Sequence, residues 1–293
     1  MSQGFIGRHP YLAMTGLILI WGVGYPIMKI GLQYCPPLLF AGLRAIGGGL
    51  VLAMLALRQD GLPKIGSTWR PMAVSGVFNV LLFFGLSTLS VQLLPAGIAS
   101  VVLYLQPIFV AGLAYAWLGE SLTGTKMIGL LLGFLGVAAI MVHGVEGTLS
   151  PVGLAYGVGS AAAWALGTVA FKRAAPKSIL WFNALPFLLG GFVILGSGVA
   201  IGERWADIAW TPMFVLVLAY GAVIGLAVSW TLWLGLVAAG EASRMSGNTF
   251  LVPVVSVAIS TVFLGEPLTA MLTAGGLAVV AGVYLVNRPA AAG

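Results

Sequence analysis

The chain of 293 residues is 60% hydrophobic and only 7% charged, with a mean hydropathy of +1.08. Soluble proteins carry roughly 25% charged residues because their surface faces water, so this composition excludes a soluble globular protein and indicates one embedded in lipid. The formal net charge of +6 comes from single basic residues between apolar runs, which excludes a nucleic-acid-binding patch.

Apolar runs long enough to cross a membrane follow one another along the chain. A helix rises about 1.5 Å per residue, so crossing a hydrocarbon layer of about 30 Å requires about 20 apolar residues. The connections are short, the longest running from Arg58 to Arg70. The sequence therefore predicts an all-α integral membrane protein with ten transmembrane helices and no soluble domain. The predicted spans are 11–32, 37–57, 71–91, 95–118, 124–143, 151–171, 179–200, 212–237, 243–264 and 268–287.

Lysine and arginine residues fall unevenly at the two ends of these spans. If the N-terminus is cytoplasmic, ten of them lie on the cytoplasmic side and only Arg204 lies on the opposite side. Loops rich in positive charge are retained in the cytoplasm. We therefore predict the N-in/C-in orientation, with both termini in the cytoplasm.

One phrase of the sequence occurs twice, as AWLGESLTG at 116–124 and as VFLGEPLTA at 262–270. The segment AGIAS at 96–100 likewise matches AGEAS at 239–243, at an offset of 143 residues. Beyond that point the offset becomes 146, and it pairs glycines as well as the residues of the repeated phrase. The pairs at this offset are Pro107 with Pro253, Glu120 with Glu266, Gly129 with Gly275 and Gly136 with Gly282.

These matches predict two repeats, at residues 1–146 and 147–293, with five spans each. Because five is odd, the second repeat enters the membrane from the opposite side, as in carriers with inverted-topology repeats. Two packings that exchange the roles of the halves then have similar energies, one open inward and one open outward. The pattern indicates a carrier that works by alternating access.

Three features together resemble the EamA family of the drug/metabolite transporter superfamily. They are WGVGYPIMK at 21–29, Arg44 in the second span, and the two blocks with Pro followed by LGE-x-LT and two glycines. Length and aromatic content are most similar to the YddG-type exporters of aromatic and other amino acids. The resemblance extends over the whole chain, and it implies ten helices around a central cavity formed mainly by helices 1, 3, 4, 6, 8 and 9.

Polar and aromatic side chains within those helices are the candidates for substrate binding. Apolar walls with a few amides and indoles would suit a hydrophobic side chain and a zwitterionic head group. Each candidate could instead pack between helices or face lipid. Lys29 is included for a substrate carboxylate, although its side chain could also reach the headgroups. The candidates are Tyr25, Lys29, Asn79, Phe83, Tyr104, Gln106, Trp164, Trp230 and Asn248.

Prolines within spans are candidate hinges, because proline removes one intrahelical hydrogen bond. Pro26, Pro107 and Pro253 are assigned this role, and the polar run at 246–249 indicates a local break in the ninth span. We expect Glu120 and Glu266 to be structural carboxylates near helix starts rather than proton sites. We also expect Arg44 to be structural and to bond the carbonyls of a helix end.

Some residue types are missing from the membrane interior. No Asp or Glu falls at mid-depth in a predicted span, which argues against exchange of cationic drugs for protons. The two His residues and Cys35 form no cluster with acids, which argues against a membrane-embedded enzyme and implies no metal and no cofactor. The single Cys also excludes an internal disulfide.

The sequence thus predicts a multi-pass protein of the bacterial inner membrane that exports amino acids, chiefly aromatic or hydrophobic ones, and related metabolites. Its partners are a small-molecule substrate and the lipid bilayer, and transport without a coupling ion is a working hypothesis. The alternatives are a carrier for nucleotide sugars, organic phosphates or cationic drugs and, less favoured, a membrane-embedded enzyme. Because one chain carries both repeats, a monomer would suffice.

Overall fold

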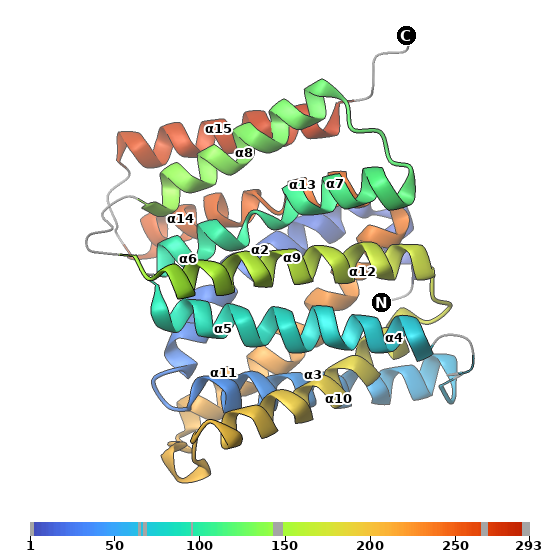
Figure 1. Ribbon diagram of the computed structural model, residues 1–293, viewed down its shortest axis with the longest axis vertical. Helices are drawn as coiled ribbons and strands as arrows, with labels where there is room; N and C mark the ends of the chain where they lie inside the picture. The colour runs from blue at the N-terminus through green and yellow to red at the C-terminus, as the bar shows by residue number, and fades with distance from the viewer. Residues whose placement is uncertain are drawn as a thin grey trace.

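The computed structural model describes residues 3–63, 66, 69–94, 96–142, 149–264 and 269–288. These residues form a bundle of helices that lie side by side, and no strand occurs among them (Figure 1). Eight of the described helices are long and apolar enough to cross a membrane, and Pro10–Gly24 is a shorter apolar stretch. The prediction of an all-α membrane protein is confirmed.

The first half of the bundle begins with a short helix and continues through the first five predicted spans. The third and fourth of these spans are divided into shorter helices, and the third span includes a π-helix. The elements are α1 (Gln3–Arg8), α2 (Pro10–Gly31), α3 (Pro37–Asp60), α4 (Trp69–Ser75), the π-helix η2 (Gly76–Leu82), α5 (Phe83–Leu93), α6 (Ala96–Leu103), α7 (Gln106–Leu118) and α8 (Gly124–Val142).

The second half repeats this order of helices, including a π-helix in its third span. Joined across these interruptions, the described helices account for the ten predicted spans. The elements are α9 (Pro151–Ala174), α10 (Ile179–Ala200), the 3-10 helix η3 (Trp205–Asp207), α11 (Pro212–Ala222), the π-helix η4 (Val223–Val228), α12 (Ser229–Ala239), α13 (Ala242–Asn248), α14 (Leu251–Leu264) and α15 (Ala270–Asn287).

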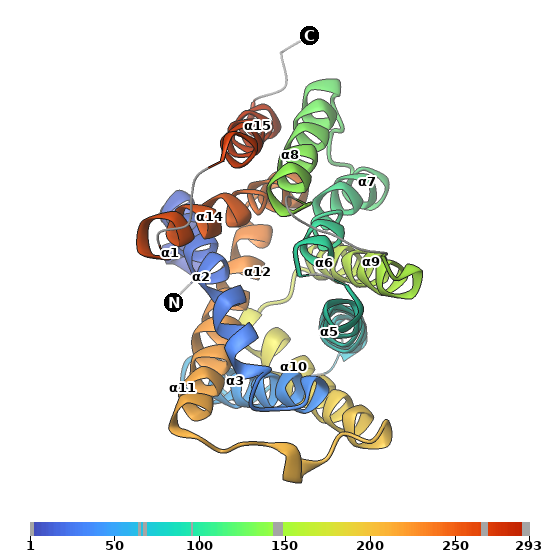
Figure 2. The same cartoon turned by 90° about the vertical axis from the view of Figure 1, so that its left-hand side faces the viewer.

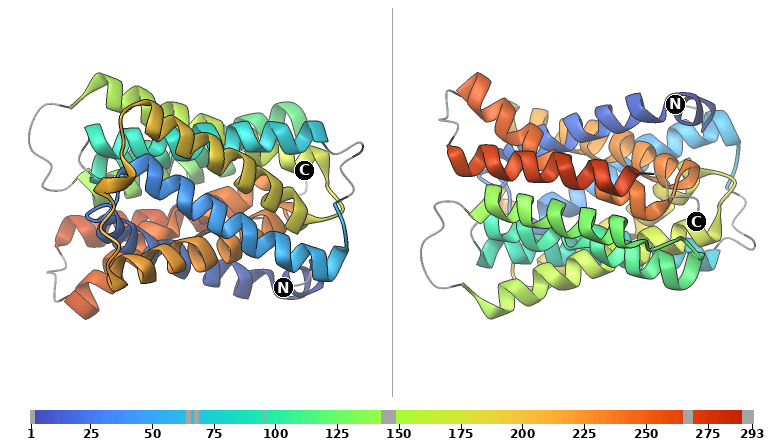
Figure 3. Two further views of the ribbon diagram at one scale, coloured as in Figure 1. Left: turned by 90° about the horizontal axis from the view of Figure 1, so that it is seen from below. Right: turned by 90° about the horizontal axis from the view of Figure 1, so that it is seen from above.

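Corresponding helices of the two halves run in opposite directions. α8 and α15 lie side by side and antiparallel, and α2 and α9 also run opposite to each other (Figure 1). α1 and the end of α15 lie at the same end of the bundle, which is the predicted cytoplasmic end (Figure 3). The two halves are therefore inverted copies, as the repeats predict.

Reciprocal glycine contacts join α8 to α15. A Cβ atom on Gly129 would lie 2.7 Å from the carbonyl oxygen of Gly282, and one on Gly136 would lie 2.6 Å from that of Gly275. Gly129 corresponds to Gly275 in the repeat, and Gly136 corresponds to Gly282. Each contact is thus the image of the other, as a pseudo-two-fold axis between the helices requires.

A second reciprocal pair is formed by α3 and α10, where an acid near the end of one helix binds the start of the other. The carboxylate of Glu203 accepts hydrogen bonds from the backbone N–H groups of Leu38, at 3.0 Å, and Leu39, at 2.8 Å. At the opposite end, the Ser178 hydroxyl donates a hydrogen bond to Asp60. Since carboxylates are favoured at helix N-termini, both contacts stabilise the antiparallel pair.

The glycine contacts predict a position-specific loss of stability. Gly282→Ala would place a Cβ atom 2.5 Å from the backbone nitrogen of Gly133, so α8 and α15 would have to separate. We expect overpacking of this kind to lower the free energy of unfolding by about 1–3 kcal/mol. Gly276→Ala, on the same helix, is the control because its Cβ would meet nothing closer than 3.9 Å. Equal thermal stability of the two variants in detergent would contradict the prediction.

Candidate functional site

The fourth and ninth spans are each interrupted along their length. α6 ends at Leu103 and α7 begins at Gln106, whereas α13 ends at Asn248 and α14 begins at Leu251. The prolines explain both interruptions, because a residue at position 107 or 253 would otherwise donate its N–H to the carbonyl four residues earlier. The second interruption directly follows the polar run at 246–249. The hinge roles of Pro107 and Pro253 stay predictions.

Aromatic residues that correspond in the repeat meet each other, one pair at these interruptions and one pair between α2 and α9. The rings of Tyr104 and Phe250, which correspond at an offset of 146 residues, have their centroids 6.3 Å apart. Trp21 and Trp164, related by an offset of 143 residues, make an edge-to-face contact at 5.5 Å. The pseudo-two-fold axis therefore passes through the middle of the bundle, at the level of the interrupted helices.

A cluster of aromatic side chains surrounds Trp164 of α9. Three of its members were predicted for the substrate site, and the structure brings them together: the ring of Phe83 lies 5.0 Å from Trp164 and 5.9 Å from Trp230. We call the whole group the aromatic cluster. Its members are Trp21, Phe83, Phe84, Trp164, Phe187, Trp230 and Trp233.

Four members of the aromatic cluster were not predicted from the sequence: Trp21, Phe84, Phe187 and Trp233. Trp21 could have been found, because its repeat partner Trp164 was a candidate and both belong to the same motif. Trp233 carries no such signal: it is one of several tryptophans in apolar helices, and it is fully buried against Trp21 and Trp164. Only its contacts in the folded chain distinguish it.

Unpaired polar atoms lie among the buried residues near the aromatic cluster. Asn79 donates from Nδ2 to Ser75, but its Oδ1 atom has no partner among the described residues and lies against Gly167, one turn from Trp164. The Nε1 atoms of Trp164 and Trp233 are also buried, with no partner in the part of the chain that the structure describes. Buried polar groups are normally hydrogen-bonded, so these atoms retain donor and acceptor capacity for a ligand.

Gln106 at the start of α7 carries a second unpaired amide. Its side chain is fully buried, and neither its Oε1 nor its Nε2 atom has a hydrogen-bond partner among the described residues. α7 packs against α9, the helix that carries Trp164. Asn79, Phe83, Gln106, Trp164 and Trp230 are thus the predicted residues whose described surroundings fit a binding role.

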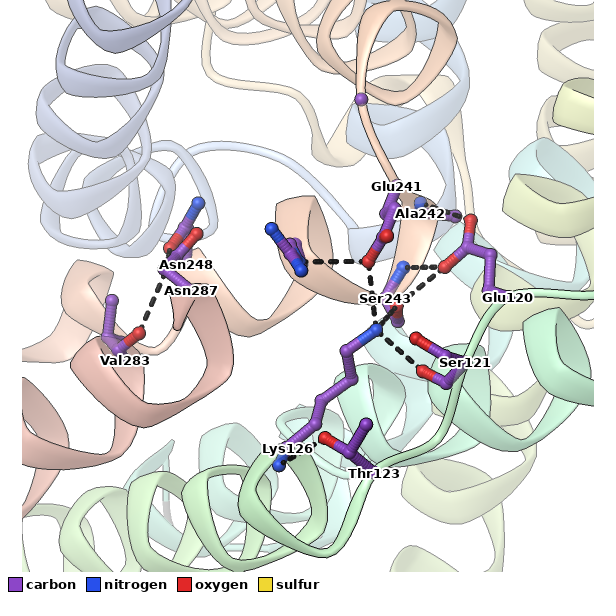
Figure 4. Close-up of polar contacts among 12 residues, drawn as sticks. Glu120, Ser121, Thr123, Lys126, Glu241, Ala242, Ser243, Asn248, Val283 and Asn287 are labelled. Carbon is purple, nitrogen blue, oxygen red and sulfur yellow. Dashed lines mark hydrogen bonds and ion pairs between the residues drawn. The ribbon is translucent and has the colours of Figure 1, made fainter. Parts of the chain in front are cut away.

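The remaining candidates behave differently. Asn248 accepts a hydrogen bond of 2.6 Å from Asn287 of α15, at the predicted cytoplasmic end (Figure 4). Tyr104 is buried and packs on Phe250. The side chains of Tyr25, Pro26 and Lys29 lie outside the described part of the chain, as does Glu266.

Arg44 of α3 is buried against α11, where its side chain fills the space left by Gly221. Its guanidinium carbon lies 5.2 Å from the centre of the Phe40 ring, an arrangement that cation–π attraction stabilises. We expected hydrogen bonds to helix-end carbonyls, and this expectation was wrong: among the described residues none is formed, and Nε has no partner. Packing and ring contact hold Arg44 instead.

A network of charged residues closes the bundle at the predicted cytoplasmic end (Figure 4). Glu120, in the turn between α7 and α8, accepts hydrogen bonds from the backbone N–H groups of Ala242, at 2.6 Å, and Ser243, at 3.1 Å. The Ser243 hydroxyl donates to the same carboxylate at 2.5 Å. Glu120 therefore does bind a helix start, but the helix is α13 of the other half rather than the helix that follows it in sequence.

Two lysines complete this network, which we call the cytoplasmic network. Lys126 of α8 lies 2.9 Å from Glu241 and donates to the Ser243 hydroxyl at 3.1 Å. Lys172 of α9 lies 3.4 Å from Glu120 and donates to the Gly240 carbonyl. Its members are Glu120, Lys126, Lys172, Glu241 and Ser243.

The surroundings of Glu120 determine its charge. Burial raises the pKa of the carboxyl, but the hydrogen bonds from Ser243 and Ala242 and the charge of Lys172 outweigh burial and lower the pKa below its usual 4.5. Glu120 is therefore ionised at neutral pH, as a structural carboxylate should be.

A bundle of membrane-spanning helices in two inverted halves, with a buried aromatic and amide centre, defines the class of membrane carriers. The EamA-like transporter family matches residues 9–142 and 151–288, and the chain belongs to this family. It is accordingly a multi-pass protein of the bacterial inner membrane.

Individual relatives agree with this assignment. The chain is 40% identical to "Uncharacterized transporter YvbV" of Bacillus subtilis, over 94% of this chain and 90% of that protein. It is 29% identical to a "Probable amino-acid metabolite efflux pump" of Salmonella typhimurium, over 95% and 94% of the two chains. A crystal structure with 18% identity has a TM-score of 0.83 and covers 94% of this chain and 95% of its own, which shows a shared fold.

The lowered pKa of Glu120 predicts how stability depends on pH. A carboxyl whose folded pKa is depressed adds stability above its unfolded pKa, and this stability is lost as the pH falls through the folded pKa. Glu120→Gln should lower the apparent Tm at pH 7 by about 3–10 °C, the effect of weakening hydrogen bonds to a charged group. The difference from the unsubstituted protein should stay constant from pH 8 to 6 and shrink below pH 4.5. A difference that vanishes by pH 6 would show a raised pKa instead.

Proposed function

We propose that this carrier exports amino acids, chiefly aromatic or hydrophobic ones, and related small metabolites by alternating access between its two inverted halves. The observation that carries the proposal is the aromatic cluster with its unpaired amide and indole groups, which includes the contact of Trp21 with Trp164 across the pseudo-two-fold axis. A site on this axis can be reached from either side of the membrane when the halves change their packing.

The chemistry of the aromatic cluster favours a zwitterion with an apolar side chain. Indole and phenyl faces attract aromatic or aliphatic side chains and, through their π electrons, an ammonium group. The indole N–H groups of Trp164 and Trp233 can donate to a carboxylate, and the Asn79 Oδ1 atom can accept from an ammonium group. No charged residue belongs to the cluster, so a multiply charged phosphate would lack counter-charges there. The printed name of the Salmonella typhimurium relative supports the same substrate class.

Downhill export without proton coupling fits the distribution of acids. Of the described acids, Asp60, Glu120, Glu203, Asp207 and Glu241 lie at helix ends or in connecting segments. Glu120 is held ionised by its partners. A carrier that exchanges its cargo for protons needs a titrating group in the membrane interior, and the described spans supply no carboxylate for that role.

Uptake into liposomes tests the proposal. The purified protein should transport labelled phenylalanine, tryptophan or leucine without a pH gradient, and faster than nucleotide sugars, organic phosphates or cationic dyes. Failure of every amino acid together with transport of one of the other classes would contradict the substrate class. Strict dependence on a pH gradient would contradict the uniport mechanism.

A second prediction separates substrate binding from folding. The Nε1 atom of Trp164 has no partner in the described structure, so Trp164→Phe removes no internal hydrogen bond. Transport should nevertheless fall roughly 2- to 10-fold, as expected when a ligand loses one hydrogen bond of about 0.5–1.5 kcal/mol. Trp117→Phe is the matched control, because Trp117 is 49% exposed on the outside of α7. Equal transport by the two variants would exclude Trp164 from the binding site.

A further inference from the structure

The two interrupted spans are packed tightly at only one end of the bundle. α7 and α13, their halves at the predicted cytoplasmic end, pack against each other. α6 and α14, the halves at the opposite end, show no comparable packing among the described residues and lie apart (Figure 2). Because the repeats are related by a pseudo-two-fold axis, a symmetric molecule would show both contacts. The structure therefore represents a state closed on the cytoplasmic side.

Two serines that correspond in the repeat show the same asymmetry. Ser243 is 1% exposed, and its hydroxyl donates to Glu120 and accepts from Lys126. Its counterpart Ser100 in α6 is only half-buried, and its hydroxyl forms no hydrogen bond in the part of the chain that the structure describes. Among the described residues, the serine of this Ala-Ser pair is thus hydrogen-bonded at the cytoplasmic end and not at the other end.

We propose that the cytoplasmic network is the inner gate of the carrier, and that Glu120 must release the start of α13 before cargo can enter from the cytoplasm. This inference rests on the alternating-access function proposed above. It gives Glu120, Lys126 and Ser243 a role in the conformational cycle in addition to holding the fold.

The contacts of the network cross between the halves that must move. Glu120 and Lys126 belong to the first half, whereas Ala242, Ser243 and Glu241 belong to the second. The acid contacts between α3 and α10, made by Glu203 and Asp60, differ in this respect, because they occur at both ends of the same helix pair. Polar contacts at both ends of a helix pair resist relative movement in either direction, whereas polar contacts at one end only favour one of two states.

The energetics of buried ion pairs suit a gate that opens repeatedly. Taking two charges out of water opposes most of their mutual attraction, so a buried pair contributes little net stability. Lys126 is 3% exposed and has three oxygen partners when the gate is closed. When the gate opens, the same charges regain water. The closed and open states can therefore remain close in free energy, and removing one partner should shift their balance.

Access to Ser246 measures the state of the gate. Ser246 lies on α13 and is fully buried, and its hydroxyl has no partner within the described structure, so Ser246→Cys is a small change. The native Cys35 lies near the opposite end of the bundle, before the start of α3. It is 4% exposed, and burial, with a smaller effect from Glu203, raises the pKa of its thiol to about 12. Its reaction with maleimides will be slow.

The experiment adds a membrane-impermeant maleimide to inside-out vesicles that contain the Ser246→Cys protein. Labelling should be slow with the gate intact and should rise about tenfold with Glu120→Gln, a shift equivalent to about 1.4 kcal/mol. Ser243→Ala, which retains both backbone donors to Glu120, should give a smaller rise. Glu203→Gln is the matched control, since Glu203 also binds a helix start but holds α3, and it should leave labelling unchanged.

The result that overturns the inference is equally specific. If Glu120→Gln and Ser243→Ala both leave the rate unchanged, or if Glu203→Gln raises it as much, the network is a static cap and not a gate. The readout needs no substrate. A rise with Glu120→Gln in a protein that transports no amino acid would support the gate and contradict only the proposed cargo.

Discussion

Close approach of backbones holds this bundle together in an apolar solvent. Apolar side chains gain little by leaving lipid for one another, so helices in a membrane associate through tight packing and polar contacts. The glycines between α8 and α15 allow the tight packing, and the acids that bind the starts of α3 and α10 make the polar contacts. Both sets are reciprocal, so they fix the pseudo-two-fold axis on which the aromatic cluster and the gate depend.

The architecture could be predicted because its signals are local or duplicated. Span length follows from the thickness of the bilayer, and a copied phrase with an odd number of spans requires inversion. The clustering of Phe83, Trp164 and Trp230 was accessible only through the family resemblance, which indicated the helices that line the centre. The π-helices η2 and η4 were not predicted, because no sequence pattern distinguishes an extra residue in a helical turn.

Long-range partners were the part that sequence reasoning missed. Glu120 was recognised as a helix-start carboxylate, but its helix lies 122 residues further along the chain. Asn248 was assigned to the pathway by its polarity, which stays a prediction, and the sequence did not indicate its hydrogen bond with Asn287. In both cases the residue type indicates which bond it can form, whereas the fold determines the partner. The aromatic cluster, in contrast, contains no charged residue.

The contact of Tyr104 with Phe250 has a consequence for the resting state of the carrier. In an antiparallel dimer of identical subunits, the same residue would face itself across the axis. The inward-open and outward-open states would then have equal free energies and equal populations. A fused pair is free to differ, and here a phenol faces a plain phenyl ring at equivalent positions. Substitutions in either repeat can therefore favour the inward-open or the outward-open state, whereas a symmetric homodimer would populate the two states equally.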